Sequence, residues 1–231
     1  MAAMTRTPRA PIALLCIVAL LLLAGCGDSD DSGSSGDSGT KTTATTATSG
    51  GPELGPAFGD MTSLPGALKT PPPWPRNEDM LQLRLRAIGL DPLTEEGQVV
   101  HIHQHLDLFV DGKPVEVPGD VGIGPQSAFI SDLHTHASYP PGIIHVESPT
   151  QAQFTLGQFF AVWGVPLSAS CIGSLCEKGA KQLSVFVDGK PVTADPTRII
   201  LAERQQIVIA YGTKTQLPDP VPATYDWPEG L

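Results

Sequence analysis

Basic side chains are scarce in this chain of 231 residues. It contains 14 Lys and Arg against 24 Asp and Glu, a formal net charge of −10. Proteins that bind nucleic acid neutralise its phosphates with Lys and Arg, so a chain this acidic is a poor candidate for that class. We therefore expect no nucleic-acid partner.

Several motifs of familiar chemistries are also missing. The sequence has no phosphate-binding glycine loop, no nucleophile elbow and no H-E-x-x-H zinc helix. Met80 is the only methionine after residue 76, which argues against a methionine-rich Cu(I) site. Histidine is confined to one part of the chain, because all six histidines lie between residues 101 and 145.

The N-terminus has the features of a lipoprotein export signal. Arg6 and Arg9 precede an apolar run over residues 12–24, which is short for a membrane span. The run ends in Leu-Ala-Gly-Cys at residues 23–26, which resembles the lipobox of bacterial lipoproteins. We expect residues 1–25 to be removed and Cys26 to be lipidated, with palmitate as one of the attached acyl chains. The lipid would anchor the protein at the extracytoplasmic face of the cell membrane. The alternatives are a plain secretory signal or an N-terminal membrane helix.

Low-complexity sequence follows the cysteine. Residues 27–51 are almost wholly small or polar, and such a segment buries too little apolar surface to offset the entropy of ordering it. Residues 52–76 are rich in Pro and Gly. These patterns predict a disordered tether over residues 26–76 and a single folded domain over residues 77–231.

The domain is expected to combine helices with a sheet. Residues 77–89 suggest a short helix capped by Asn77, and Thr155 is the expected cap of a second helix ending at Gly164. Residues 99–110 alternate like a strand, and Asp111-Gly112 is a strong hairpin signal before a return strand over residues 113–117.

A second hairpin resembles the first in sequence. Residues 183–192 repeat residues 106–115 at eight of ten positions, and short apolar runs at residues 143–146 and 207–211 add further strands. The order favours an α+β fold: a mostly antiparallel sheet with one or two packed helices, β-grasp-like in its sequence of elements. A cupin-like β-barrel is the alternative, since H-x-H on a strand is common there.

The histidines have the spacing of metal ligands on strands. His101, His103 and His105, together with Asp107, fall on one face of the strand over residues 99–110, because side chains alternate along a strand. Two further pairs have the same spacing: His134 with His136, and His145 with Glu147. We expect His103, His105, His134, His136 and His145 to converge on one point, with His101 or Glu147 at its margin.

Two interpretations compete with a metal site: structural or solubility histidines, and a metal-free catalytic site. The second hairpin argues against a purely structural role, because its first strand has Lys178, Ala180 and Gln182 where the other has histidines. Imidazole suits zinc, copper, nickel and iron alike, and we expect a transition-metal ion, zinc or copper.

Cys171 and Cys176 are the cysteines that remain free of lipid once the signal is removed and Cys26 is lipidated. Outside the cytoplasm a pair this close is expected to form a disulfide. A thiolate metal site is the lesser alternative, because a single C-x4-C pair lacks a partner pair.

Four longer motifs resemble those of a group of uncharacterised exported prokaryotic proteins. They are H-I-H-Q-H-L at residues 101–106, L-H-T-H at 133–136, G-I-I-H-V-E-S-P at 142–149 and T-L-G-Q-F-F at 155–160. The resemblance runs from about Met80 to Gly212 and implies a shared domain with the histidine motifs as its signature. It implies no substrate.

Three functions follow as hypotheses. The first is a metal-binding lipoprotein that stores, delivers or senses an ion, with an unknown protein partner. The second is an extracytoplasmic metal-dependent enzyme, hydrolytic or oxidative, with Glu147 or Asp107 as general base. The third is a structural or interaction domain.

Overall fold

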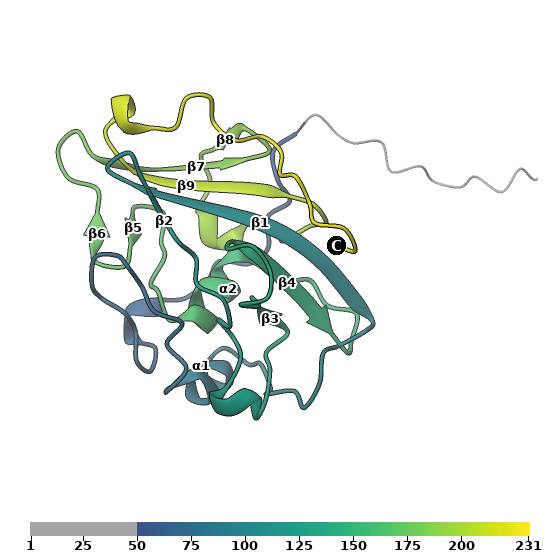
Figure 1. The fold of residues 1–231 in the computed structure, drawn as a ribbon. Coiled ribbons are helices and arrows are strands. Elements are labelled where there is room, and N and C mark those ends of the chain that lie inside the picture. Colours follow the sequence, from purple (N-terminus) through teal and green to yellow (C-terminus); the bar gives the residue numbers. More distant parts are fainter. Residues whose placement is uncertain (1–49) are drawn as a thin grey trace, which may run out of the picture. The chain divides into compact units, whose positions relative to one another are not determined.

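A computed structural model describes residues 50–231 (Figure 1). The expected signal peptide, Cys26 and the first part of the expected tether lie outside the described residues. Within residues 50–231, no helix is both long and apolar enough to cross a bilayer.

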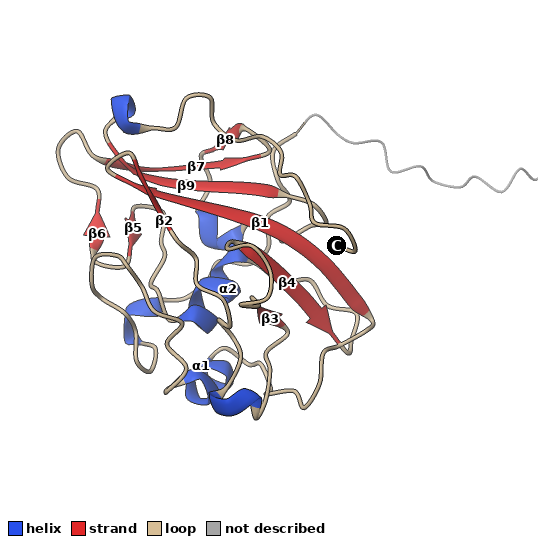
Figure 2. Ribbon diagram, in the orientation of Figure 1, coloured by secondary structure: helices blue, strands red, loops and turns tan. Residues whose placement is uncertain are grey.

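The domain has the expected α+β architecture. A mixed seven-stranded sheet has the order β3-β4-β1-β9-β7-β8, with β2 also pairing with β1. Helices α1 (Leu81–Ala87) and α2 (Leu156–Trp163) lie on one side of it (Figure 2). The strands are β1 (Val100–Val110), β2 (Lys113–Val115), β3 (Leu133–His134), β4 (Ile143–Ser148), β7 (Gln182–Val187), β8 (Lys190–Val192) and β9 (Gln206–Gly212).

The sheet is open, so the cupin-like barrel is wrong for the described part of the chain. β1 and β9 are parallel neighbours in the middle of the sheet, and the other pairings are antiparallel. The elements that suggested a β-grasp-like arrangement are present in their expected order, but β3 and β4 are inserted between the first hairpin and helix α2, and a small extra hairpin follows that helix.

Both predicted hairpins are confirmed. The turn residues Asp111 and Gly112 have φ of 52° and 77°, and Asp188 and Gly189 have φ of 51° and 72°. Two positive φ angles in a two-residue loop match the right-handed twist of the flanking strands, which is why Asp-Gly is favoured there.

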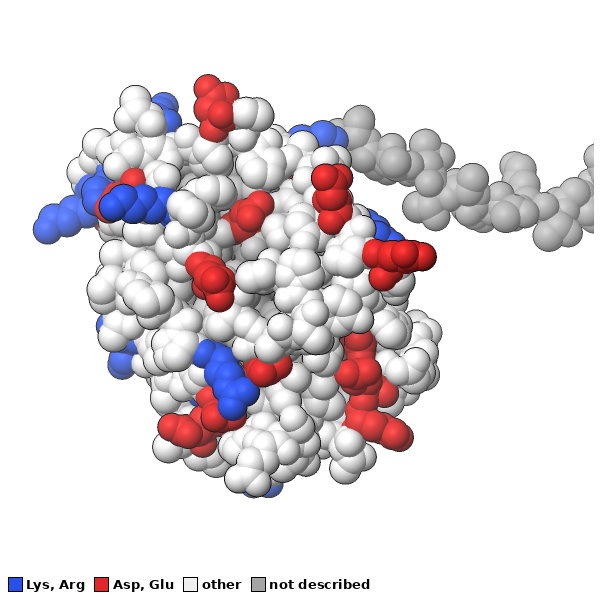
Figure 3. All heavy atoms as spheres, in the orientation of Figure 1, with Lys and Arg blue, Asp and Glu red and all other residues white. Residues whose placement is uncertain are grey.

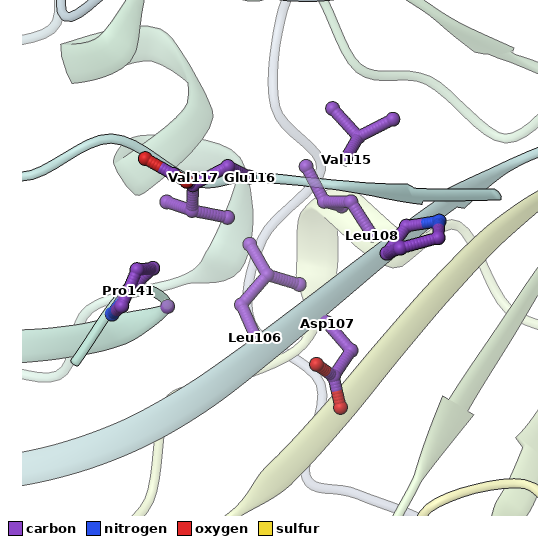
Figure 4. A pocket seen from close by; sticks show the side chains of 9 residues that line it. Leu106, Asp107, Leu108, Val115, Glu116, Val117 and Pro141 are labelled. Atoms are coloured by element: carbon purple, nitrogen blue, oxygen red, sulfur yellow. The ribbon is translucent and has the colours of Figure 1, made fainter.

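The two faces of the sheet have different chemistry. Leu106 and Leu108 point to one side of β1, towards Val115 and Val117, whereas Asp107 points to the other (Figure 4). The leucine side belongs to the hydrophobic core, which also contains the buried aromatic side chains of α2. Because side chains alternate along β1, the odd-numbered histidines lie on the face away from this core.

Helix α2 begins and ends as predicted. The Thr155 hydroxyl accepts a hydrogen bond from the Gln158 backbone, the Gln158 side chain bonds back to the Thr155 backbone, and Gly164 ends the helix with φ of 83°. Helix α1 corrects one prediction. Its N-cap is Met80 and not Asn77, whose amide instead donates to the carbonyls of Gly66 and Trp163.

The predicted start of the folded domain at Asn77 is also corrected. Met61 and Trp74 are 3% and 2% exposed and belong to the core, and Trp74 meets Trp163 edge to face. The Leu68 backbone further bonds to Gly164 at 2.7 Å. A Pro- and Gly-rich composition suggested a tether here, but its few large apolar residues give residues 61–76 enough buried surface to pack.

The predicted disulfide is present. Cys171 and Cys176 are bonded and are direct partners in the small hairpin of β5 (Cys171–Ile172) and β6 (Leu175–Cys176). Both thiols are therefore committed to each other and play no part in the histidine cluster.

Candidate metal centre

Strand register brings the histidines of three segments together. In the pairing of β1 with β4, His103 lies opposite His145 and His101 lies opposite Glu147. In the pairing of β4 with β3, His145 lies opposite His134. One row across the sheet therefore reads His134, His145, His103, and directly opposite residues on a face have Cβ atoms about 5 Å apart.

Four side chains form the tightest group. His134, His136, His145 and Glu147 each offer one ligand atom, and these atoms all lie within 4.8 Å of one another. The Nε2 atoms of His134 and His136 are 3.1 Å apart. A tetrahedral ion with Zn–N bonds of about 2.0–2.1 Å separates two ligand nitrogens by about 3.3 Å, so the pair is already close to ligand spacing.

The residue between the two neighbouring histidines holds them in place. The Thr135 hydroxyl donates to the Pro118 carbonyl and accepts from the Val121 backbone, and the Thr135 backbone pairs with Val121 and Asp120. These bonds tie Thr135 to the loop over residues 118–122. His134 and His136, on either side of it, are thereby positioned together.

Hydrogen bonds also select the tautomers of two of these histidines. His134 Nδ1 lies 2.9 Å from the Ser131 carbonyl, and a carbonyl only accepts, so Nδ1 carries the proton. His145 Nδ1 lies 3.0 Å from Glu147 Oε1, which accepts in the same way when ionised. Each neutral ring then has its lone pair on Nε2, an arrangement by which metal-binding histidines are oriented in proteins.

Burial keeps several of these imidazoles neutral. Burial, with repulsion from His145 and His101, lowers the pKa of His103 to about 4. Burial likewise lowers the pKa of His134 to about 3, although Glu147 opposes it. Burial alone would raise the pKa of Glu147, but its hydrogen bond with His145 and the nearby His134 and His101 bring it below its usual value. At pH 7 His103 and His134 are thus neutral imidazoles near an ionised Glu147, the protonation state that binds metal.

Three candidate ligand atoms, two in this group of four and one on the neighbouring His103, are buried and make no hydrogen bond within residues 50–231. They are His103 Nε2, His145 Nε2 and Glu147 Oε2. Leaving a buried polar atom without a partner costs about 1–3 kcal/mol, and more when the group is charged. Cations bound among them would satisfy all three atoms.

His105 does not join the cluster, which corrects the expected ligand set, and Asp107, named only as a possible general base, lies outside the cluster as well. His105 lies opposite Ile143 on β4 and Gln206 on β9, its Nδ1 is 3.0 Å from Gln206 Oε1, and its ring stacks on Tyr225. Asp107 accepts a hydrogen bond from Gln206. His105 does lie on the predicted face of β1. It is displaced along the strand from His103 by two residues, or about 6.6 Å, so it does not face the side chains that His103 faces.

Glu147 and His101, both expected at the margin of the site, differ in their positions. Glu147 is only 2% exposed and lies in the middle of the cluster, because the register sets it beside His145 and opposite His101. The side chain of His101 is 43% exposed, with its Nε2 3.4 Å from Glu147 Oε1. Of these two residues, only His101 therefore lies at the margin of the site.

Two neighbours of the cluster carry no sequence signal. Glu96 Oε1 lies 3.4 Å from His136 Nε2, and Tyr139 packs against the rings of His136 and His145. Glu96 comes from a loop that precedes β1, so only the tertiary fold places it there. His136 also lines an open pocket whose other residues include Glu95, Glu96, Asp120 and Phe129.

This pocket connects the cluster with solvent, since the His136 side chain is 20% exposed. Of its three carboxylates, Asp120 pairs with Arg76 at 3.4 Å, and Glu95 and Glu96 leave the opening with a negative charge that attracts cations. Acidic side chains are spread over the face of the molecule seen in Figure 3, consistent with the net charge of −10.

The fold and the cluster together define the class: an α+β domain with a buried His/Glu group that could hold a metal ion. No family model, curated protein or solved structure matches the chain.

Proposed function

We propose that this protein is an envelope-anchored lipoprotein that binds a transition-metal ion and serves in metal storage, delivery or sensing. The observation that carries the proposal is the set of unpartnered ligand atoms, His145 Nε2 and Glu147 Oε2 above all, beside the paired Nε2 atoms of His134 and His136. Polar atoms buried without partners in a group of this composition are accounted for by a bound cation.

The donor set supports a transition metal. Three imidazole nitrogens and one carboxylate suit zinc, copper or iron, whereas calcium and magnesium prefer oxygen ligands throughout. Zinc fits three histidines with a fourth position filled by carboxylate or water. Zinc is therefore our first choice, and Cu²⁺ is the second.

The acidic opening supports handling of the ion. Glu95, Glu96 and Asp120 line the pocket that leads to His136, the most exposed of the four ligands. Glu96 and then His136 are the side chains that an ion entering by this route would meet first. The lipobox-like residues 23–26 support anchoring of the protein at the membrane.

Metal analysis of the purified full-length protein tests the proposal. After equilibration with Zn²⁺ and removal of free metal, we expect at least one ion per chain by mass spectrometry. His134→Ala with His136→Ala should lose the ion that these two side chains would bind, since removal of two ligands exceeds the 10–100-fold cost of losing an outer partner. His105→Gln is the matched control, because His105 lies on the same strand face but outside the cluster, and it should keep the ion. Wild-type protein without metal after loading would refute the proposal.

The same pocket favours one alternative, a metal-dependent enzyme. Its lining combines Phe129 and Ile130 with carboxylates directly beside His136, which could hold an organic substrate at the ion. Asp107 is remote from the group, so Glu147 remains the candidate base of the two named from the sequence. Turnover of small ester or phosphoester substrates by the Zn²⁺-loaded protein, lost in His136→Ala, would favour this alternative over handling.

A further inference from the structure

A second set of ligands lies on the other side of Glu147. His101, His103 and Glu147 each offer a ligand atom, again within 4.8 Å of one another. His101 Nε2 is 3.4 Å from Glu147 Oε1, and His103 Nε2 is buried with no hydrogen-bond partner in the described residues. A single ion at His134, His136 and His145 leaves this second set unexplained.

Glu147 presents its two oxygens to the two sets. Oε2 lies 3.8 Å from His134 Nε2, while Oε1 lies towards His101. Oε1 also accepts from His145 Nδ1. A carboxylate has about four lone-pair sites on its two oxygens, so it can accept that bond and bind an ion through each oxygen.

We propose that the cluster binds two transition-metal ions, with Glu147 as the bridging ligand between them. The inner ion is held by His134, His136 and His145, and the outer ion by His101 and His103. This inference rests on the proposed function and deepens it. The expected separation of the ions is about 3.5–4 Å, as in other two-metal sites.

Carboxylates lie near both halves of the site, where their negative charges would balance two divalent cations. Glu96 lies 3.4 Å from His136 at the inner half. Glu203 accepts from the His103 backbone at 2.9 Å at the outer half. The two halves differ in exposure, because His134 is fully buried whereas the His101 side chain is 43% exposed. We therefore expect the inner ion to bind more tightly and the outer ion to be removed first.

Zn²⁺ stoichiometry of the full-length protein tests this inference. We expect two ions per chain in the wild type, one in His101→Gln with His103→Gln, and two in the control His105→Gln. His101→Gln alone replaces a half-exposed side chain and should keep the fold, so it serves if the double variant does not fold; it should weaken only the second binding step.

The outcomes separate the two proposals. One tightly bound ion in the wild type would overturn the two-ion site and leave the proposed function standing, and no ion would overturn both. Two ions that persist in the folded His101→Gln, His103→Gln variant would place the second ion elsewhere and also overturn the inference.

A spectroscopic measurement adds independent evidence. In protein loaded with Cu²⁺, two ions about 4 Å apart couple magnetically, so the resonance of isolated Cu²⁺ is weakened. His101→Gln with His103→Gln should restore the isolated-ion spectrum. An uncoupled spectrum in the fully loaded wild type would contradict a shared carboxylate.

Discussion

His103 on β1 and His145 on β4 are direct cross-strand partners, and their rings meet edge to face with centroids 4.6 Å apart. The Nε2 atoms of both rings are buried and make no hydrogen bond within residues 50–231. Two such imidazoles side by side cost stability in the metal-free protein. Removing metal, lowering the pH or distorting this site should therefore change the stability or the metal affinity of the protein.

Removing metal should lower the melting temperature. A ligand present at 100 times its Kd stabilises the native state by about 2.7 kcal/mol, provided the unfolded chain does not bind it. For a domain of this size that corresponds to roughly 5–10 °C. Calorimetry with and without a chelator checks the change, and His134→Ala with His136→Ala, which removes two ligands of the inner ion, should reduce it. An unchanged melting temperature in the loaded wild type would count against any ion at this site.

Acid should destabilise the metal-free protein. The pKa values of His103 and His134 in the folded state, about 4 and about 3, lie below the ordinary value of 6.5. The unfolded chain therefore takes up protons first, so stability is full above pH 6.5 and falls as the pH drops towards 4. A pKa that is lower by one in the folded state than in the unfolded chain corresponds to about 1.4 kcal/mol of stability. We therefore expect acid to lower the free energy of unfolding by a few kcal/mol through these histidines.

Urea unfolding at several pH values, in the presence of a chelator, measures this loss. Between pH 6.5 and 5 ordinary carboxylates remain ionised, so the slope there reports mainly on the histidines. His103→Gln should show a shallower slope than the wild type. Stability that stays level or rises as the pH falls from 6.5 to 5 would contradict the buried neutral histidines.

Gly122→Ala should disturb His134. Gly122 has φ of 77°, and a Cβ there would lie 2.3 Å from the Leu133 carbonyl oxygen and 3.0 Å from His134 Cβ. We expect a loss of about 1–3 kcal/mol from the strained backbone, a larger loss from the clash, and weaker Zn²⁺ binding. Gly179→Ala is the matched control: its φ of 62° brings the same strain, but no atom lies within 4 Å of its Cβ. Equal effects of both substitutions on metal affinity would refute the role of Gly122.

Cys26→Ser should release the protein from the membrane fraction or leave it unprocessed, since Leu-Ala-Gly-Cys at residues 23–26 resembles a lipobox. Fractionation with metabolic labelling by palmitate checks this. A variant that is cleaved at the same site and remains membrane-bound would show that the anchor lies elsewhere.

Local patterns were enough to predict much of this fold. Alternation placed His101, His103 and His105 on one face of β1, Asp-Gly marked both hairpins, and Thr155 with Gly164 marked the ends of α2. Each of these signals depends on residues a few positions apart, whose steric and hydrogen-bonding preferences act without the rest of the chain. The disulfide was also predictable from local sequence, because its two cysteines are only five positions apart.

Which histidines meet was decided by the pairing of distant strands. The register that sets His103 opposite His145, and His145 opposite His134, leaves His105 beside Gln206 and Tyr225 and brings Glu147 to the centre. A different register would exchange these neighbours while leaving the pattern within each strand unchanged. Periodicity thus determined the face on which each candidate ligand lies. Only the tertiary packing of β1, β3 and β4 determined its neighbours, because register is set by contacts between segments and not within them.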